Sequence, residues 1–214
     1  MSYFFELHIE SAPSDINPHL YVSLNRGRYQ LCTANAIYSF EDLYDNFFDA
    51  FKLIELEKYS IENVLILGLG LGSIPTMLEK NFEKQYNYTA IEIDESVIYL
   101  ASKYALPQLT SNIQTICTDA FAYVMQTEEQ FDMICMDVFL DDVVPDFFEE
   151  DIFLEKLKTL VKPTGILLFN RLANHPKDIQ DTKIFYKNKF LPIFPNGQYL
   201  EVKGNWMLLN RPLR

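Results

Sequence analysis

The chain has 214 residues, 49% of them hydrophobic and 22% charged, so it can bury a sizeable core and is not a wholly disordered chain. Its net charge of -12, from 30 acidic and 18 basic residues, argues against nucleic acid or an anionic membrane surface as a partner and leaves a cationic ligand open. Three widely spaced cysteines favour a reducing, cytoplasmic chain, and the sequence predicts neither a signal peptide nor a membrane-spanning helix.

The first 40 residues predict short strands rather than helices. Residues 20–24 and 29–33 form a candidate hairpin around Arg26 and Gly27. From residue 41 to 56 the apolar period becomes helical, with Ser39 as a candidate N-cap. We therefore expect a small N-terminal β extension over residues 1–40, followed by a separate unit over residues 41–214.

Strands and helices alternate from residue 64 onward. The expected strands are 64–67, 88–93, 113–117, 133–136 and 166–169, followed by a closing hairpin of 199–202 and 206–209. The expected helices are 73–81, 95–104, 120–125, 147–160 and 179–189. This alternation predicts an α/β fold with a doubly wound, mostly parallel, Rossmann-like sheet of seven strands that ends in an antiparallel hairpin.

The glycine-rich segment VLILGLGLGS, residues 64–73, is the strongest motif. Gly68, Gly70 and Gly72 follow a strand and precede a helix, which places them at the ligand-binding edge of such a sheet. A dinucleotide loop has the spacing G-x-G-x-x-G, but Ser73 stands at its last position. The tighter G-x-G-x-G spacing favours adenosylmethionine, and a nicotinamide-dependent oxidoreductase is the disfavoured alternative.

Two further acidic positions follow strands on the same edge. Glu92, with Ile93 beside it, comes about 20 residues after the loop, where a carboxylate can accept hydrogen bonds from ribose hydroxyls; a surface carboxylate is the alternative. Asp119 can accept from an adenine amino group while Ala120 offers its N–H; a helix N-cap is an equally good and compatible interpretation of Asp119.

Residues 137–151 are rich in acids. An electronegative mouth for a cationic substrate is one interpretation, but we favour a solvated loop and a helix dipole for all except Asp137. Asp137 ends the fourth strand, where acids are typical of a functional edge. The scattered histidines and cysteines predict no metal site.

With VLILGLGLGS, AIEID, TDAF and MDVFLDDVVP in this order, the chain resembles the class I adenosylmethionine-dependent methyltransferase fold, in its spermidine-synthase-like branch. The resemblance covers about residues 20 to 170. It implies that the three loop glycines bend around the methionine-derived part of the cofactor, that Glu92 holds the ribose and that Asp119 contacts the adenine. It also implies that Asp137 accepts a proton from a nucleophilic amine.

The chain departs from the aminopropyltransferases of that branch at several positions. Leu71 replaces the loop aspartate that meets the aminopropyl ammonium, Asp141 occupies a shifted position, and Asp45, Asn46 and Phe47 replace a histidine–glutamate pair. We therefore expect an enzyme that uses S-adenosylmethionine to methylate a small molecule, with an amine among the candidate substrates.

Two other functions stay open. One is an aminopropyltransferase that uses decarboxylated S-adenosylmethionine, and the other is a non-catalytic binding or dimerisation module on the same fold. The aromatic helix at residues 43–56 would suit a homodimer, although a monomer is equally consistent with the pattern.

Overall fold

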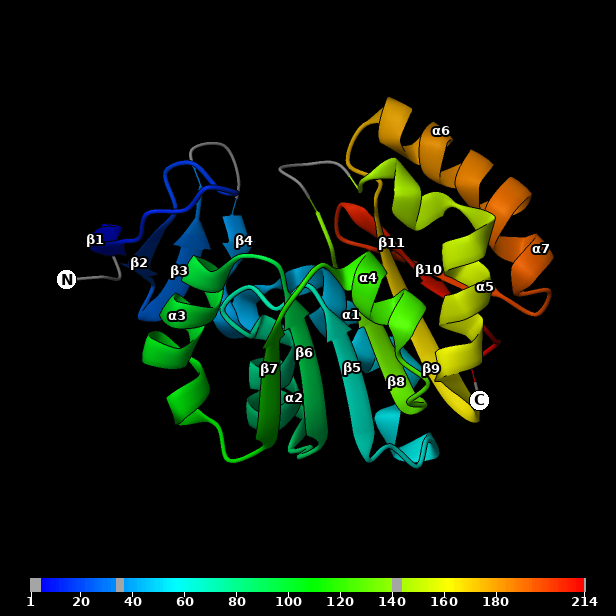
Figure 1. Cartoon of the computed structure of the whole chain (residues 1–214), viewed down its shortest axis with the longest axis horizontal. Helices are drawn as coiled ribbons and strands as arrows, with labels where there is room; N and C mark the ends of the chain where they lie inside the picture. The colour runs from blue at the N-terminus through cyan, green and yellow to red at the C-terminus, as the bar shows by residue number, and fades with distance from the viewer. Residues whose placement is uncertain (1–4, 34–36, 140–143, 214) are drawn as a thin grey trace.

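The computed structural model describes residues 5–33, 37–139 and 144–213. A small antiparallel sheet lies beside a larger, mostly parallel sheet that carries helices on both faces (Figure 1). Among the described residues, we find no helix with the length and apolar character needed to cross a membrane.

The small sheet has the order β1-β2-β3-β4. Its strands are β1 (Leu7–Ser11), β2 (Tyr21–Asn25), β3 (Arg28–Cys32) and β4 (Ile37–Ser39). The predicted hairpin is confirmed as β2 and β3, which pair in antiparallel register. Arg26 and Gly27 both have positive φ, 53° and 76°, as the tight turn between two twisted strands requires.

The large sheet has the order β10-β11-β9-β8-β5-β6-β7. Its strands are β5 (Asn63–Leu67), β6 (Asn87–Glu92), β7 (Asn112–Cys117), β8 (Phe131–Met136), β9 (Val161–Leu172), β10 (Gln198–Val202) and β11 (Asn205–Leu209). β5 to β9 pair in parallel, whereas β11 is antiparallel to both of its neighbours. The predicted α/β class, doubly wound sheet and closing hairpin are thus confirmed.

Seven α-helices connect these strands in the part of the chain that is described. They are α1 (Asp45–Ile54), α2 (Ser73–Phe82), α3 (Glu95–Tyr104), α4 (Ala120–Gln126), α5 (Asp151–Leu160), α6 (Pro176–Phe185) and α7 (Leu191–Ile193). Shorter turns are η1 (Glu41–Leu43), η2 (Leu56–Lys58), η3 (Leu106–Gln108), η4 (Asp146–Glu149) and the π-helical turn η5 (Tyr186–Phe190).

Two predicted helices begin later than their apolar period indicates. The helix expected from residue 41 starts at Asp45, because Glu41 has a positive φ of 41° and accepts the N–H of Tyr29 at 2.7 Å. Ser39 does not cap it, since its hydroxyl contacts Ser73 instead. The helix expected over 147–160 is divided at Glu150, whose ψ of 145° is extended.

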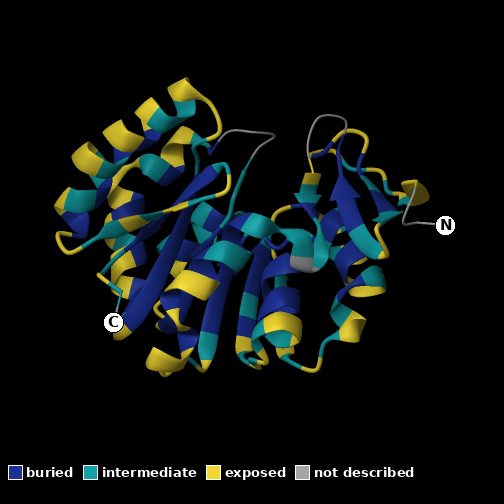
Figure 2. Ribbon diagram, turned by 180° about the vertical axis from the view of Figure 1, so that it is seen from behind, coloured by how far each residue is buried: buried dark blue, intermediate teal, exposed yellow. Residues whose placement is uncertain are grey.

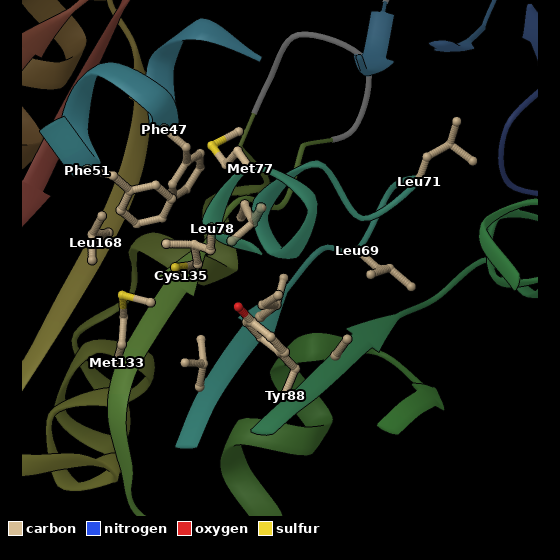
Figure 3. Packing of buried hydrophobic residues seen from close by; sticks show 14 of the residues in the cluster. Phe47, Phe51, Leu69, Leu71, Met77, Leu78, Tyr88, Met133, Cys135 and Leu168 are labelled. Carbon is tan, nitrogen blue, oxygen red and sulfur yellow. The ribbon is translucent and has the colours of Figure 1, made fainter. Parts of the chain in front are cut away.

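The inner strands β5, β8 and β11 of the large sheet bury both faces, as continuous apolar sequences predict, whereas the edge strands β7 and β10 are partly exposed. One face packs against α1, α2 and α3 and the other against α4, α5 and α6, so consecutive strand residues enter different clusters. Figure 2 shows this buried centre, with exposed residues concentrated on the outer sides of the helices. Figure 3 shows part of the first cluster, where Phe47 and Phe51 of α1 lie near Met77 and Leu78 of α2.

The small sheet packs onto the large unit through apolar and polar contacts. Leu20, Val22 and Leu31 belong to the same apolar cluster as α1 and α2. Glu10 of β1 accepts hydrogen bonds from Lys103 and Tyr104 of α3. The division of the chain at residue 40 stays a prediction, and the two parts share one core.

Candidate active site

A cavity of about 490 Å³ opens at the carboxyl ends of β5, β6, β7 and β8. Its size lies within the range of roughly 300–1,000 Å³ that is usual for small-molecule sites. The small sheet contributes Ile16, Asn17 and the segment 37–39 to the wall, while the parallel strands contribute the loops that follow them. The residues predicted as ligand contacts lie on this wall, with Gly72 as the exception.

The glycine loop shapes one side of the cavity. Gly68 has a φ of 90°, and a Cβ built there would lie 2.4 Å from the backbone oxygen of Asp137, so only glycine lets these two strand ends approach. A Cβ at Gly70 would meet the Cβ of Ser39 at 3.2 Å. Both residues line the cavity.

Gly72 does not line the cavity, so its place among the cofactor contacts stays a prediction that the geometry does not support directly. It is the N-cap residue of α2, with a φ of 81°, and a Cβ there would lie 2.9 Å from the side chain of Leu106. The glycine is therefore needed for the start of the helix and its packing.

Glu92, the last residue of β6, holds the glycine loop through hydrogen bonds. Its Oε2 accepts the N–H groups of Leu69 and Gly70 at 3.2 and 3.3 Å, and its Oε1 accepts those of Ile93 and Asp94 at 3.0 and 3.1 Å. Burial raises the pKa of Glu92, while these backbone donors act in the opposite direction. Glu92 and Ile93 line the cavity, so the carboxylate is both a brace for the loop and an acceptor on the wall.

Asp119 and Ala120 form the wall after β7. One oxygen of Asp119 accepts the N–H of Ala122 at 2.8 Å, so the residue is the N-cap of α4. Both residues also line the cavity. Asp119 therefore caps α4 and also lies on the cavity wall, and the sequence had indicated that these two roles are compatible.

Asp137 lies at the end of β8 and is held by two donors. Its Oδ1 accepts from the amide of Asn170 at 2.8 Å and from the hydroxyl of Tyr44 at 3.3 Å. The amide oxygen of Asn170 in turn accepts from Asn205 at 2.9 Å. Burial raises the pKa of Asp137 to about 6, although the hydrogen bonds from Asn170 and Tyr44 lower it. An acid with this pKa is suited to exchanging a proton near neutral pH.

Tyr44 stays protonated in this arrangement. Burial, followed by the charge of Asp137, raises the pKa of its hydroxyl well above the ordinary value. Its ring stacks on Phe47 at a centroid distance of 6.3 Å, which fixes the hydroxyl over the carboxylate. Tyr44 is therefore a fixed hydrogen-bond donor to Asp137.

Sequence reasoning did not single out Tyr44 or Asn170 as site residues. Asn170 follows Phe169 on β9, and Phe169 pairs with Met136 on β8, so the parallel register places Asn170 beside Asp137. A polar residue at the carboxyl end of a buried strand was the available signal. Tyr44 gave a weaker signal, because it resembles an apolar position of the helix that follows.

Of the acids described between residues 137 and 151, only Asp137 lines the cavity. Glu149 pairs with Arg171 of β9, and Oδ1 of Asp151 lies 3.0 Å from Nζ of Lys189. The solvated loop and the helix dipole stay predictions for these acids. Asp141 and Asp142 lie outside the described residues. No group of three or more His, Cys, Asp or Glu side chains within the described ranges is placed to hold a metal ion.

Leu71 points into the protein rather than into the cavity. It is 1% exposed and belongs to the same apolar cluster as Met77 and Leu78 (Figure 3). The cavity therefore has no carboxylate at this loop position, and the leucine itself does not meet a ligand.

The model of the spermine/spermidine synthase domain matches residues 50–200 of the chain. The chain belongs to this family. Its sequence is 30% identical over 152 residues to a polyamine aminopropyltransferase of Vibrio vulnificus (strain CMCP6); the match covers 70% of this chain and 50% of that protein. The chain thus spans about half the length of this curated relative.

Two solved structures share the fold. A spermidine synthase in complex with the transition state analogue AdoDATO superposes with a TM-score of 0.73 at 19% identity, over 95% of this chain and 72% of that one. Human methyltransferase-like protein 13 in complex with SAH gives a TM-score of 0.58 at 23% identity, over 75% and 74%. These likenesses show the class I methyltransferase and spermidine synthase fold of the chain.

Proposed function

We propose that this chain transfers an alkyl group from an adenosyl sulfonium cofactor to a small amine. The observation that carries this proposal is Asp137, a carboxylate held by Tyr44 and Asn170 on the wall of a cavity that also carries Glu92 and Asp119. The open cavity also favours an enzyme over a non-catalytic module. Membership of the family and the bound SAH and AdoDATO of the structural neighbours support the choice of cofactor.

The residues of the wall fit such a cofactor. Glu92 would hold the ribose hydroxyls, Asp119 and Ala120 would contact the adenine beside Ile93, and Gly70 leaves room for the methionine-derived end. When bound, the sulfonium supplies an electrophilic carbon. The protein would align the nitrogen of the amine with this carbon and keep the amine from other orientations, because alignment supplies much of the rate of such a transfer.

Asp137 would bind the acceptor amine and take a proton from it. An ammonium group has no lone pair with which to attack, so its proton must leave before or during the transfer. With a pKa of about 6, Asp137 is ionised at neutral pH and can accept that proton. Tyr44 and Asn170 both donate to Oδ1, which orients the carboxylate.

Two groups are candidates for transfer. A methyl group from adenosylmethionine is the first, because Leu71 leaves the loop without a counter-ion for the aminopropyl ammonium. An aminopropyl group is the second. It is favoured by the similarity to a polyamine aminopropyltransferase and by a wall that carries three carboxylates and, among the described residues, no lysine, arginine or histidine.

The test is a transfer assay with both cofactors and a panel of small monoamines and diamines, including putrescine, read by mass spectrometry of the amine. We expect one cofactor to give an alkylated amine, and Asp137→Asn to lose nearly all turnover. Asp151→Asn is the matched control, because this acid lies in the same acidic stretch but pairs with Lys189 away from the cavity. Turnover that survives in Asp137→Asn, or no transfer from either cofactor, would overturn the proposal.

A further inference from the structure

Two buried serine hydroxyls meet on the cavity wall beside the glycine loop. Ser39 ends β4 of the small sheet, and Ser73 begins α2. Their Oγ atoms lie 2.6 Å apart, and the N–H of Phe40 donates to the Oγ of Ser73 at 3.1 Å. The two residues are 1% and 4% exposed, yet both line the cavity.

The hydrogen atoms of this pair leave one donor unused. One hydroxyl hydrogen lies between the two oxygens, whichever serine donates it. The other hydroxyl hydrogen has no acceptor among the residues that the structure describes. A buried hydroxyl group gains by donating to an acceptor, so the pair can donate to an oxygen of a ligand in the cavity.

The start of α2 adds to the same part of the wall. The first N–H groups of a helix have no partner within the helix, and here they belong to Ser73 and Ile74, both on the cavity wall. The helix dipole places a partial positive charge at this end. The charged side chains on the described wall are the carboxylates of Glu92, Asp119 and Asp137. The electrostatic potential at the start of α2 is therefore positive, whereas the carboxylates make it negative elsewhere on the wall.

We propose that Ser39 and Ser73 bind the carboxylate of the amino-acid end of adenosylmethionine and so select it over the decarboxylated cofactor. The inference rests on the proposed function and deepens it, because it states which adenosyl cofactor the site takes. The carboxylate is the one group that the intact cofactor has and the decarboxylated one lacks. The hydroxyl pair and the start of α2 offer the donors that this anion needs, next to the loop glycine Gly70.

The experiment is a calorimetric titration of the full chain with adenosylmethionine, decarboxylated adenosylmethionine and methylthioadenosine, which lacks the amino-acid end altogether. We expect Ser39→Ala and Ser73→Ala each to weaken adenosylmethionine binding by about tenfold or more, the usual size for a hydrogen bond to a charged group. Binding of the other two ligands should change by less than about threefold, on the same grounds.

Ser23→Ala is the matched control. Ser23 is a serine of the small sheet like Ser39 and is fully buried in β2, but it does not line the cavity. It should change none of the three affinities. Equal losses for all three ligands, or no loss for adenosylmethionine, would overturn the role of the pair while leaving the proposed function intact. If the wild-type chain binds none of the three ligands, the proposed function fails and the inference fails with it.

Discussion

Asp137→Asn should gain stability relative to wild type as the pH rises from acid to neutral, while it removes the proposed proton acceptor. Burial raises the pKa of Asp137 from 3.8 to about 6, so the folded protein favours the neutral acid more than the unfolded chain does. Its contribution to stability is complete below pH 3.8 and is lost as the pH rises through about 6. At 1.36 kcal/mol per pKa unit, the loss is about 3 kcal/mol of unfolding free energy by pH 7.5.

Urea unfolding of wild type and Asp137→Asn between pH 4 and pH 8 measures this effect. The difference in unfolding free energy between the two should rise in favour of the variant by about 2.5 kcal/mol across that range, because at pH 4 a small part of the contribution is already lost. A constant offset is expected as well, because the new amide hydrogens lack acceptors. Other titrating groups cancel in the difference. A difference that stays constant from pH 4 to pH 8 would show that folding does not raise the pKa of Asp137.

Three further predictions concern the loop, the site and the scaffold. Gly68→Ala should cost roughly 3 kcal/mol or more of unfolding free energy, because its Cβ would lie 2.4 Å from the backbone oxygen of Asp137. Gly204→Ala, also at positive φ, should cost only about 1 kcal/mol, because its Cβ would meet no atom closer than Oδ1 of Asn174 at 3.5 Å, an ordinary contact; equal costs in urea unfolding would contradict this. Asn170→Ala should raise the pKa of Asp137 and move the acid limb of the rate–pH profile to higher pH, and an unmoved limb would count against the hydrogen bond. Burial opposes ionisation of Glu79, but hydrogen bonds from the turn before β7 lower its pKa to about 2; this stability is present above pH 4.5 and is lost as the pH falls towards 2. Glu79→Gln should therefore cost about 1–2 kcal/mol at pH 7 after allowance for solvent screening, and thermal unfolding at pH 7 and pH 3 checks it.

The fold followed from the sequence where local period and tertiary packing agree. The strand that ends at Leu67 and the helix Glu95–Tyr104 lie where the apolar pattern placed them, because both bury the side chains that define the pattern. The pattern failed at residue 41, where Glu41 contacts a neighbouring strand across a distance in sequence that no local period records.

The candidate site was predictable from the sequence where its residues follow the strands of the parallel sheet. Glu92, Asp119 and Asp137 each follow a parallel strand, so the topology alone brings them to one edge. Tyr44 and the serine pair come from segments far apart in the chain, and only the packing of β4 and of the start of α1 around the glycine loop brings them to the cavity. Asn170 reaches Asp137 through the parallel register of β8 and β9. Gly72 satisfied the motif for a different reason, the start of α2.

A calorimetric titration of the wild-type chain with adenosylmethionine, its decarboxylated form and NAD side by side measures which class of cofactor the cavity binds. We expect an adenosyl sulfonium cofactor to bind at one site per chain and NAD not to bind. Glu92→Ala should abolish the binding, because the ribose and the loop both lose their acceptor. Binding of NAD in preference to both sulfonium compounds, or sulfonium binding that Glu92→Ala leaves unchanged, would contradict this prediction.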